Sequence, residues 1–262
     1  MKSFESFESF KSIELMLASA NKHKLSEIQE CIVHGRVQGR VQIIGAPFSL
    51  DVEESGTSYR ENSLIKAAAY YRKFKVPTLA DDSGLEVLAL PGELGIYSAR
   101  FGENTSENTS VNISYEEKCL LLLDKLDRAE KLGNIENCNI EKYNIENKEK
   151  REVVGRNAYF ICVLCCYLSP HEIYFFEGRL DGKIGRTLEG DGGFGFDPVF
   201  IPDGAVAVAV AGVDADLINS SAPTLAMLPE WKRENSHRAR ACRRLCEFLI
   251  GRSGGFSHNH NF

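Results

Sequence analysis

The acidic pair Asp81 and Asp82 carries the strongest chemical signal in this sequence. Both residues lie in an Ala-Asp-Asp-Ser-Gly segment at residues 80–84, at the end of the short apolar run 78–80. Open α/β sheets place their sites at the ends of such strands. Because adjacent carboxylates repel each other, we expect a cation beside them, and Mg²⁺ suits carboxylate oxygens, water and phosphates. The pair predicts a Mg²⁺ site for a phosphorylated ligand; the alternative is an ordinary Asp-Ser-Gly turn.

A second acidic pair, Glu53 and Glu54, precedes a Ser-Gly-Thr triplet and a helical segment that carries Lys66. Both glutamates offer the oxygen donors that Mg²⁺ prefers, so they are further candidate ligands. The alternative is that they only interact favourably with the dipole of the helix that follows.

A small and polar segment, Ser-Ala-Asn-Lys-His-Lys at residues 19–24, stands where an apolar strand gives way to a helix. Backbone N–H groups at the N-terminus of a helix attract anions, and Lys22 or Lys24 would add positive charge. The segment therefore predicts an anion site. The alternative is that its polar side chains only cap the helix.

Glycine is dense in the stretch Gly-Asp-Gly-Gly-Phe-Gly-Phe-Asp-Pro at residues 190–198. Glycine lets a ligand approach the backbone closely, and a phenyl ring offers a face on which a base can stack. Of Phe194 and Phe196, we expect one ring to anchor the loop in the core and the other to be available for a purine. The alternative is a turn in which both rings only pack.

Three basic residues, Lys232, His237 and Arg238, flank the start of the last helical segment. They offer donors to a phosphate or to a purine keto oxygen, and the guanidinium group allows a fixed planar contact that lysine cannot make. The alternative is a solvated first helical turn.

Apolar periodicity predicts the elements that position these residues. We expect strands at residues 13–17, 78–80, 85–90, 158–168 and 173–176, of which 158–168 is continuously apolar and so buried on both faces. We expect helices around four sets of apolar residues at helical spacing: Leu25, Ile28 and Ile32; Leu64, Ala67, Ala68 and Tyr71; Leu120, Leu123 and Leu126; and Cys242, Leu245, Cys246 and Leu249. Pro77 ends the second helix, and Ser236 caps the last. Helices and strands alternate, which predicts an α/β fold.

The composition limits the class of protein. A net charge of −6 argues against bulk electrostatic binding to nucleic acid. No apolar stretch reaches the roughly 18 residues that a membrane span requires. The eight cysteines are irregularly spaced, and those at 162, 165 and 166 lie in an apolar run, as buried thiols of a reducing compartment do. A zinc site at Cys162 and Cys165 lacks further ligands nearby. We expect a cytoplasmic protein with neither a nucleic acid nor a membrane as partner.

The chain is long enough for one medium domain, which we expect at residues 13–250. Residues 1–12 repeat a Ser-Phe-Glu unit and predict a disordered extension, and 251–262 predict a flexible tail. Segments 103–114 and 133–151 are of low complexity and predict surface insertions, because such composition cannot bury a core. A third insertion, 205–224, begins with an Ala-Val repeat that could pack as a strand or short helix.

Taken in order, these motifs resemble the inosine triphosphate pyrophosphatase family, also called the non-canonical purine NTP pyrophosphatases. The resemblance covers residues 17–249. It is carried by the segments 17–24, 53–57, 80–84, 91–101 and 192–198, by Glu61, Asn62 and Lys66, and by the Ser-His-Arg triplet at 236–238. It implies an elongated, two-lobed α/β fold around a long mixed sheet with flanking helices, a nucleotide cleft between the lobes, and a homodimer.

The resemblance also implies a role for each matching residue. Asp82 would be the general base and, with Glu53 or Glu54, a ligand of Mg²⁺. The implied substrate contacts are Ser19, Asn21 and Lys24 for the phosphates, Ser83, the loop residues Phe194, Gly195 and Phe196 with Phe194 stacked on the purine, Asp197 and Lys232 near the base, and His237 and Arg238 at its keto edge. Ala20 departs from the family pattern, which has glycine there, and slightly narrows the space near the phosphates.

The implied reaction is hydrolysis of ITP, dITP and XTP to the monophosphate and pyrophosphate, which cleanses the nucleotide pool. Discrimination against ATP would follow because a 6-amino group leaves a buried donor without an acceptor. Two alternatives stay open. One is a pyrophosphatase for another modified nucleotide, such as a pyrimidine or a damaged dNTP. The other is a nucleotide-binding regulator without turnover, which the four intact acids argue against.

Overall fold

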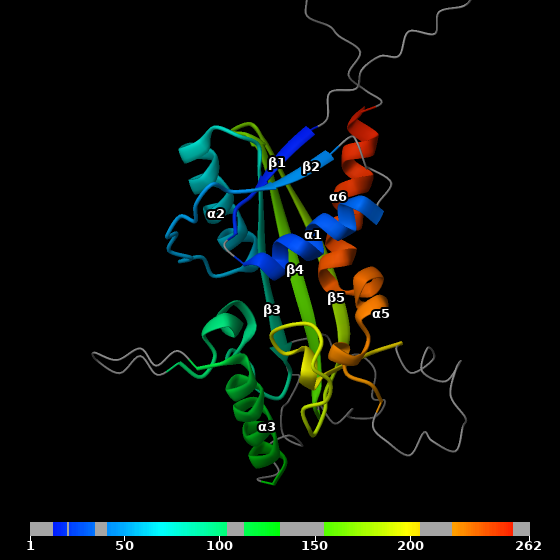
Figure 1. Cartoon of the computed structure of the whole chain (residues 1–262). Helices are drawn as coiled ribbons and strands as arrows, with labels where there is room; N and C mark the ends of the chain where they lie inside the picture. The colour runs from blue at the N-terminus through cyan, green and yellow to red at the C-terminus, as the bar shows by residue number, and fades with distance from the viewer. Residues whose placement is uncertain are drawn as a thin grey trace, which may run out of the picture. The chain divides into compact units, whose positions relative to one another are not determined.

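The computed structural model describes residues 13–19, 21–34, 41–103, 113–131, 155–204 and 222–253 (Figure 1). Within these residues the strands are β1 (Ile13–Leu17), β2 (Val41–Gly45), β3 (Thr78–Val87), β4 (Asn157–Ser169), β5 (Glu172–Ile184) and β6 (Phe200–Pro202). The α-helices are α1 (Lys22–His34), α2 (Tyr59–Phe74), α3 (Tyr115–Lys131), α5 (Pro229–Asn235) and α6 (His237–Ser253). Short 3₁₀ turns are η1 (Gly95–Arg100), η2 (Asp197–Val199) and η4 (Leu225–Met227).

The strands form one six-stranded sheet in the order β2-β1-β3-β4-β5-β6. β1 pairs in parallel with β2 and with β3, and β5 pairs antiparallel with β6. The sheet is therefore mixed, which confirms the α/β fold class predicted from the sequence.

The chain divides into two compact units. Unit 1 comprises Met1–Asp82, Val163–Glu177 and Arg238–Phe262, and unit 2 comprises Ser83–Cys162 and Gly178–His237. Strands β3, β4 and β5 each contribute residues to both units.

In unit 1, helices cover both faces of the sheet. Successive residues of a strand point to opposite faces. Ala80 of β3 packs in a cluster with Ala67 and Tyr70 of α2. The next residue, Asp81, is bonded to side chains from α1 and α6. It follows that α2 lies on one face of β3 and that α1 and α6 lie on the other.

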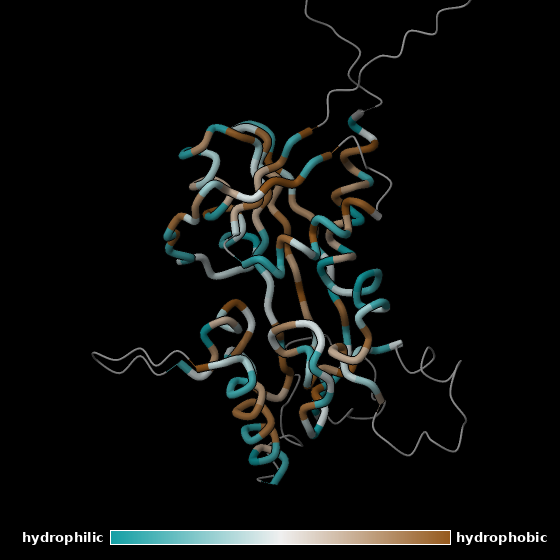
Figure 2. The backbone as a smooth tube through the Cα atoms, in the orientation of Figure 1, coloured by the Kyte–Doolittle hydropathy of each residue, from teal (hydrophilic) through white to brown (hydrophobic). Residues whose placement is uncertain are grey.

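Unit 2 is built around a larger apolar core. Residues of β3, α3, β4 and β5 contribute to it, including Leu85, Leu122, Phe160 and Leu180. Helix α3 buries Leu122, Leu123 and Leu126 and leaves Leu120 exposed. Figure 2 accordingly shows hydrophobic and hydrophilic residues alternating along this helix.

Most predicted elements are confirmed. The strand at 13–17 and the helices around Leu25, Leu64, Leu120 and Leu245 are present, and β4 is buried continuously from Cys162 to Tyr167. Helix α2 ends at Phe74, before Pro77, and Lys75 with its positive φ of 59° forms a left-handed cap. Helix α6 begins directly after Ser236.

Two strand boundaries are wrong. Residues 78–80 and 85–90 do not form separate strands, because β3 runs without a break through the Asp-Asp-Ser-Gly segment to Val87. The segment 173–176 is only the first part of β5. Most of the insertions predicted at 103–114, 133–151 and 205–224 lies outside the described residues, as do residues 1–12 and the end of the tail predicted at 251–262. The single domain expected at 13–250 stays a prediction.

Candidate active site

The two acids of the Asp-Asp pair lie within β3 and point to opposite faces of the strand. Asp81 is 1% exposed and Asp82 is 6% exposed, so both carboxylates are removed from water. Because they face opposite ways, they cannot jointly hold one ion. The prediction that the pair lies at the end of a short strand is wrong, because β3 continues to Val87, and the alternative of an Asp-Ser-Gly turn is wrong for the same reason. Each acid has its own surroundings.

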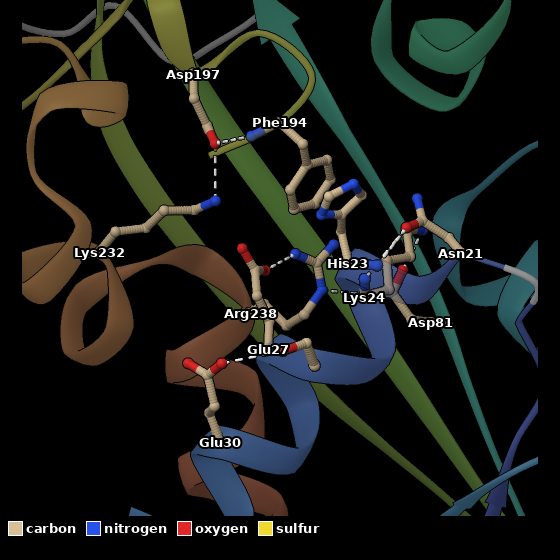
Figure 3. Close-up of polar contacts among 11 residues, drawn as sticks. Asn21, His23, Lys24, Glu27, Glu30, Asp81, Phe194, Asp197, Lys232 and Arg238 are labelled. Carbon is tan, nitrogen blue, oxygen red and sulfur yellow. Dashed lines mark hydrogen bonds and ion pairs between the residues drawn. The ribbon is translucent and has the colours of Figure 1, made fainter. Parts of the chain in front are cut away.

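Asp81 is neutralised by two cations of the protein itself (Figure 3). Its Oδ1 forms an ion pair with Lys24 Nζ of α1. Its Oδ2 lies 3.0 Å from Nε of Arg238, which is 1% exposed. Arg238 Nη1 also forms an ion pair with Glu27 of α1. For Asp81, these side chains supply the compensating charge that the sequence led us to expect from Mg²⁺.

The start of α1 is organised by its own polar side chains. Asn21 Oδ1 accepts hydrogen bonds from the backbone N–H of His23 at 2.9 Å and of Lys24 at 3.3 Å. Ser19 Oγ accepts from the backbone N–H of Asn21 at 3.1 Å. Asn21 therefore caps the helix, as the alternative interpretation proposed. The phosphate contacts of Ser19, Asn21 and Lys24 stay predictions.

Asp82 is the carboxylate with the most unusual electrostatic environment. Its Oδ2 is buried without a hydrogen-bond partner among the described residues. Burial raises the pKa of Asp82 to about 6, and Glu54 and Asp81 act in the same direction against the opposing charges of Lys66 and Lys24. A carboxylate with this pKa is half-protonated in mildly acidic solution and is suited to exchange protons near neutral pH.

Glu54 and Lys66 lie next to Asp82 on the α2 side of unit 1. Lys66 Nζ is 2.8 Å from Glu54 Oε1 and donates a hydrogen bond of 3.1 Å to the backbone carbonyl of Asp81. Glu54 is partly buried, whereas Glu53 is exposed. Glu54 rather than Glu53 is among the charges that act on Asp82. The structure thus associates the second acidic pair with Asp82 through Glu54.

A divalent cation fits these residues in part. Within the described ranges, no three His, Cys, Asp or Glu side chains gather into a complete metal site. However, the unpartnered Oδ2 of Asp82 and the charge of Glu54 offer two oxygen donors. Mg²⁺ usually takes only one or two carboxylates and completes its shell with water and substrate phosphates. A full protein cage is therefore not required.

A separate cluster of polar groups forms in the glycine-dense loop of unit 2 (Figure 3). Lys232 Nζ lies 2.7 Å from Asp197 Oδ2, and both residues are buried. The same oxygen accepts a hydrogen bond of 2.8 Å from the backbone N–H of Phe194. Lys232 Nζ also lies 4.6 Å from the centroid of the Phe194 ring. Gly193 has a φ of 74°, and a Cβ there would collide with the Asp197 carboxylate.

The two phenylalanines of the loop have different surroundings. Phe196 is 3% exposed and packs edge-on against Phe101 and Tyr115. Phe194 is only partly buried. The expectation that one ring anchors the loop is therefore confirmed for Phe196. The predicted stacking of Phe194 on a purine stays a prediction, as do substrate contacts of Gly195 and of the Phe196 backbone.

The remaining predicted residues divide between the two units. His237 belongs to unit 2, is 5% exposed, and stacks on Phe160 with ring centroids 4.8 Å apart. Arg238 belongs to unit 1, and two of its nitrogens are already engaged by Asp81 and Glu27. Ser83 is partly buried in β3. The keto-edge role of His237 and Arg238 stays a prediction.

Sequence reasoning missed Glu27 and did not assign a role to Lys66. Glu27 follows Lys24 by three residues, so both lie on one face of α1. That spacing could have indicated a shared partner. Lys66 is one turn beyond Asn62 on α2, and Asn62 Oδ1 accepts a hydrogen bond from the backbone N–H of Gly56 at 2.8 Å. The same helix therefore fixes the Glu54 loop and supplies its counter-ion.

The cysteines of β4 lie in its buried stretch. Cys162, Cys165 and Cys166 are all buried in β4. Burial raises the pKa of Cys165 and of Cys166 to about 12, so these thiols stay protonated near neutral pH. None of the described helices is both long enough and apolar enough to cross a membrane.

Comparisons with known proteins agree with this architecture. A dITP/XTP pyrophosphatase of Aquifex aeolicus is 33% identical over 239 residues, which cover 90% of this chain and 96% of that protein. The enzyme of the same name from Staphylococcus aureus is 32% identical and covers 91% of this chain and 97% of its own length.

Solved structures of Ham1 proteins have a similar fold. The Ham1 protein of Staphylococcus aureus superposes with a TM-score of 0.62 at 30% identity, covering 91% of this chain and 99% of that one. A Ham1 protein of Coxiella burnetii gives a TM-score of 0.63 at 26% identity, with the same coverage of both chains. The Ham1 family model matches residues 15–134 and 132–248. The resemblance inferred from the sequence motifs is thus confirmed, and the chain belongs to the Ham1 family.

Proposed function

We propose that this protein hydrolyses the non-canonical purine nucleotides ITP, dITP and XTP to the monophosphate and pyrophosphate, and so cleanses the nucleotide pool. Membership of the Ham1 family and relatives named dITP/XTP pyrophosphatase support a hydrolase that acts on nucleoside triphosphates. The observation that carries the proposal within this chain is Asp82, a buried carboxylate with a pKa of about 6 and with one oxygen that has no hydrogen-bond partner in the part of the chain that the structure describes.

Asp82 acts as the general base in this proposal. Its carboxylate accepts the proton of the water that attacks the triphosphate. A base whose pKa lies near the working pH is ionised in a sufficient fraction of molecules and still binds a proton well. Lys66 lies beside it and holds Glu54 at 2.8 Å. Lys24 and the capped start of α1 bind and orient the phosphates, together with Ser19 and Asn21.

The proposed cofactor is Mg²⁺, with Asp82 and Glu54 as its protein ligands. Bound there, it would neutralise phosphate charge and make a nearby water more acidic. Glu54 is preferred over Glu53 because it is partly buried and its charge acts on Asp82.

The loop of unit 2 binds the purine in this proposal. Phe194 stacks on the base, while Asp197 holds both the Phe194 backbone and Lys232 in place through Oδ2. His237 and Arg238 donate to the keto edge, and Ser83 contacts the substrate. A 6-amino group would leave such a donor unpaired, which costs about 1–3 kcal/mol and gives moderate selectivity against ATP.

Two further properties extend the proposal. We propose a homodimer, which light scattering after size-exclusion chromatography tests. We also propose a cytoplasmic protein with no membrane or nucleic-acid partner. Localisation of a fluorescent fusion and a binding assay with DNA and RNA test these two points.

Product analysis tests the reaction directly. We expect ³¹P NMR of dITP incubated with enzyme and Mg²⁺ to show dIMP and pyrophosphate in equal amounts. Formation of dIDP and inorganic phosphate would instead indicate terminal phosphate removal and reject the proposal. A pyrophosphatase for another modified nucleotide would leave dITP intact but cleave that nucleotide. A binding protein without turnover would leave every nucleotide intact.

A further inference from the structure

Helices α1 and α6 of unit 1 are connected by two side-chain pairs, one helical turn apart. The first pair is the ion pair between Glu27 and Arg238. Four residues further along each helix stand Cys31 and Cys242, whose thiols are hydrogen-bonded to each other. Because residues at i and i+4 share one face of a helix, the ion pair and the thiol pair belong to one continuous interface.

The two thiols differ in exposure. Cys242 is 0% exposed, whereas Cys31 is partly exposed. The hydrogen bond with Cys242 lowers the pKa of Cys31, and the charge of Arg238 acts in the same direction, against burial and the charges of Glu27 and Glu30. The thiolate is the reactive form of cysteine. Cys31 is therefore the accessible member of the pair, and its thiolate is favoured by its surroundings.

We propose that Cys31 and Cys242 form an oxidation site at which hydrogen peroxide closes a disulfide between α1 and α6. The Cys31 thiolate attacks one oxygen of peroxide, which yields a sulfenic acid on Cys31 and hydroxide. The Cys242 thiol then attacks the Cys31 sulfur and forms the sulfur–sulfur bond. The hydroxyl group of the sulfenic acid leaves, takes up the proton of the Cys242 thiol, and departs as water. The two thiols lose two electrons in all, and these reduce one peroxide molecule to water.

The position of the pair makes the reaction selective. A disulfide joins two sulfurs directly, and the hydrogen bond between the two thiols makes Cys242 the partner that the Cys31 sulfur meets. Burial raises the pKa of Cys246, one turn beyond Cys242, to about 11. Burial also raises the pKa of Cys119 in unit 2 to about 12. Both of these thiols stay protonated and should react slowly.

The closed disulfide would join the two helices that hold the Asp81 charge network. Lys24 lies on α1 and Arg238 lies at the start of α6, and both pair with Asp81. Closing the disulfide would therefore shift the helices that position Lys24 and Arg238. The oxidation itself does not depend on which nucleotide the protein hydrolyses.

Differential labelling of the full chain tests the site. The protein is treated with hydrogen peroxide, unfolded in guanidinium with iodoacetamide, reduced, and labelled again with N-ethylmaleimide before peptide mapping. We expect the second label on Cys31 and Cys242 alone, with the first label on the other six of the eight cysteines. Cys119 serves as the internal control for a buried thiol. Without peroxide, all eight cysteines should carry the first label.

Two variants make the assignment specific. In Cys31→Ser, Cys242 should retain the first label after peroxide treatment, and in Cys246→Ser the disulfide should still form. A bridge from Cys31 to Cys246, a bridge between two copies on a non-reducing gel, or sulfinic acid on Cys31 with Cys242 unmodified would each overturn the proposal. If a variant fails to fold, the peptide map of the peroxide-treated wild type still distinguishes these outcomes.

Discussion

Arg238 and Asp81 form a buried ion pair in unit 1, with Nε 3.0 Å from Oδ2 and side chains 1% and 0% exposed. Glu27 and Lys24 complete this network from α1. Asp81 is thereby committed to balancing protein cations. Of the two acids, Asp82 is the one with a buried carboxylate oxygen that has no hydrogen-bond partner among the described residues. Asp81 is therefore a structural acid, and its neighbour Asp82 is the candidate catalytic acid.

Removal of Arg238 should be strongly destabilising. Arg238→Met would leave Asp81 and Glu27 with less compensating charge, and loss of one member of a buried pair costs about 3–5 kcal/mol. Urea denaturation measures this change. The matched control is Arg128→Met, because Arg128 pairs with Asp124 at the surface, where loss costs at most about 0.5 kcal/mol. Equal effects of the two substitutions would contradict the structural role assigned to Arg238.

Neutralising Asp82 should stabilise the fold while abolishing turnover. Burial raises its pKa from 3.8 to about 6, so above that pH the folded state holds an ionised carboxylate that water would solvate better. This rise in pKa corresponds to a loss of about 3 kcal/mol in the free energy of unfolding at high pH. Below pH 3.8 the carboxyl is protonated in both the folded and the unfolded state, and the penalty disappears.

Asp82→Asn should therefore be more stable than wild type at pH 8, with the advantage shrinking as the pH falls from 6 towards 4. Urea denaturation in the presence of a chelator measures it at both ends of this range. A variant that is less stable than wild type at pH 8 would show that the ionised carboxylate makes favourable contacts that the structure does not contain.

The rate of hydrolysis should depend on the ionisation of Asp82. A general base works only when deprotonated, so kcat/KM should fall below about pH 6, by about tenfold for each further pH unit. Bound Mg²⁺ favours the ionised form, so rising Mg²⁺ should move this limb to lower pH. The measurement is a pH–rate profile at two metal concentrations. An unchanged rate from pH 8 to pH 4.5 would argue against Asp82 as the base.

The two phenylalanines of the glycine-dense loop should respond differently to substitution. Phe194→Ala removes the proposed stacking partner of the base and should raise KM by about tenfold, with little loss of stability. Phe196→Ala removes a buried ring and should cost about 3–5 kcal/mol of folding free energy. Steady-state kinetics and thermal denaturation of both variants separate these roles. A KM effect confined to Phe196→Ala would reverse the assignment.

The two glutamates of the second acidic pair provide a test of the metal ligand. Glu54→Gln should raise the Mg²⁺ concentration needed for half-maximal activity, because Glu54 lies within electrostatic reach of Asp82. Glu53 is exposed, so Glu53→Gln should leave the requirement close to wild type. Titration of activity with Mg²⁺ measures both. A larger effect of Glu53→Gln would assign the ligand to Glu53.

The regular elements could be predicted where apolar spacing is strong, as around Leu25, Leu64 and Leu245. The continuity of β3 could not, because its centre is Asp-Asp-Ser-Gly, residues that usually indicate a turn. The strand tolerates them because Lys24 and Arg238 neutralise Asp81 from α1 and α6. Strand β2 could not be predicted either, because its five residues are too few for an apolar pattern to distinguish a strand.

The sequence predicted which residues belong to the candidate site better than it predicted which of them form ion pairs with each other. The motifs identified Asp82, the Asp197 loop and Lys232, but not the ion pair between Lys232 and Asp197, which are 35 residues apart. Glu27 and Arg238 are separated by 211 residues, so no local pattern relates them. Long-range charge pairs depend on how strands and helices are ordered in space, and that order is not encoded in local periodicity.

The central claim is that Asp82 enables metal-dependent hydrolysis of non-canonical purine triphosphates. The most direct measurement is pyrophosphate release from ITP, XTP, dITP, ATP and GTP, with Mg²⁺ and with chelator, for wild type and Asp82→Asn. We predict that ITP, XTP and dITP are cleaved about tenfold or more faster than ATP, in a reaction that depends on Mg²⁺ and is lost in the variant although it folds. Full activity of Asp82→Asn, or release from ATP as fast as from ITP, would contradict the account, whereas release from GTP would show that the site reads the 6-keto oxygen alone.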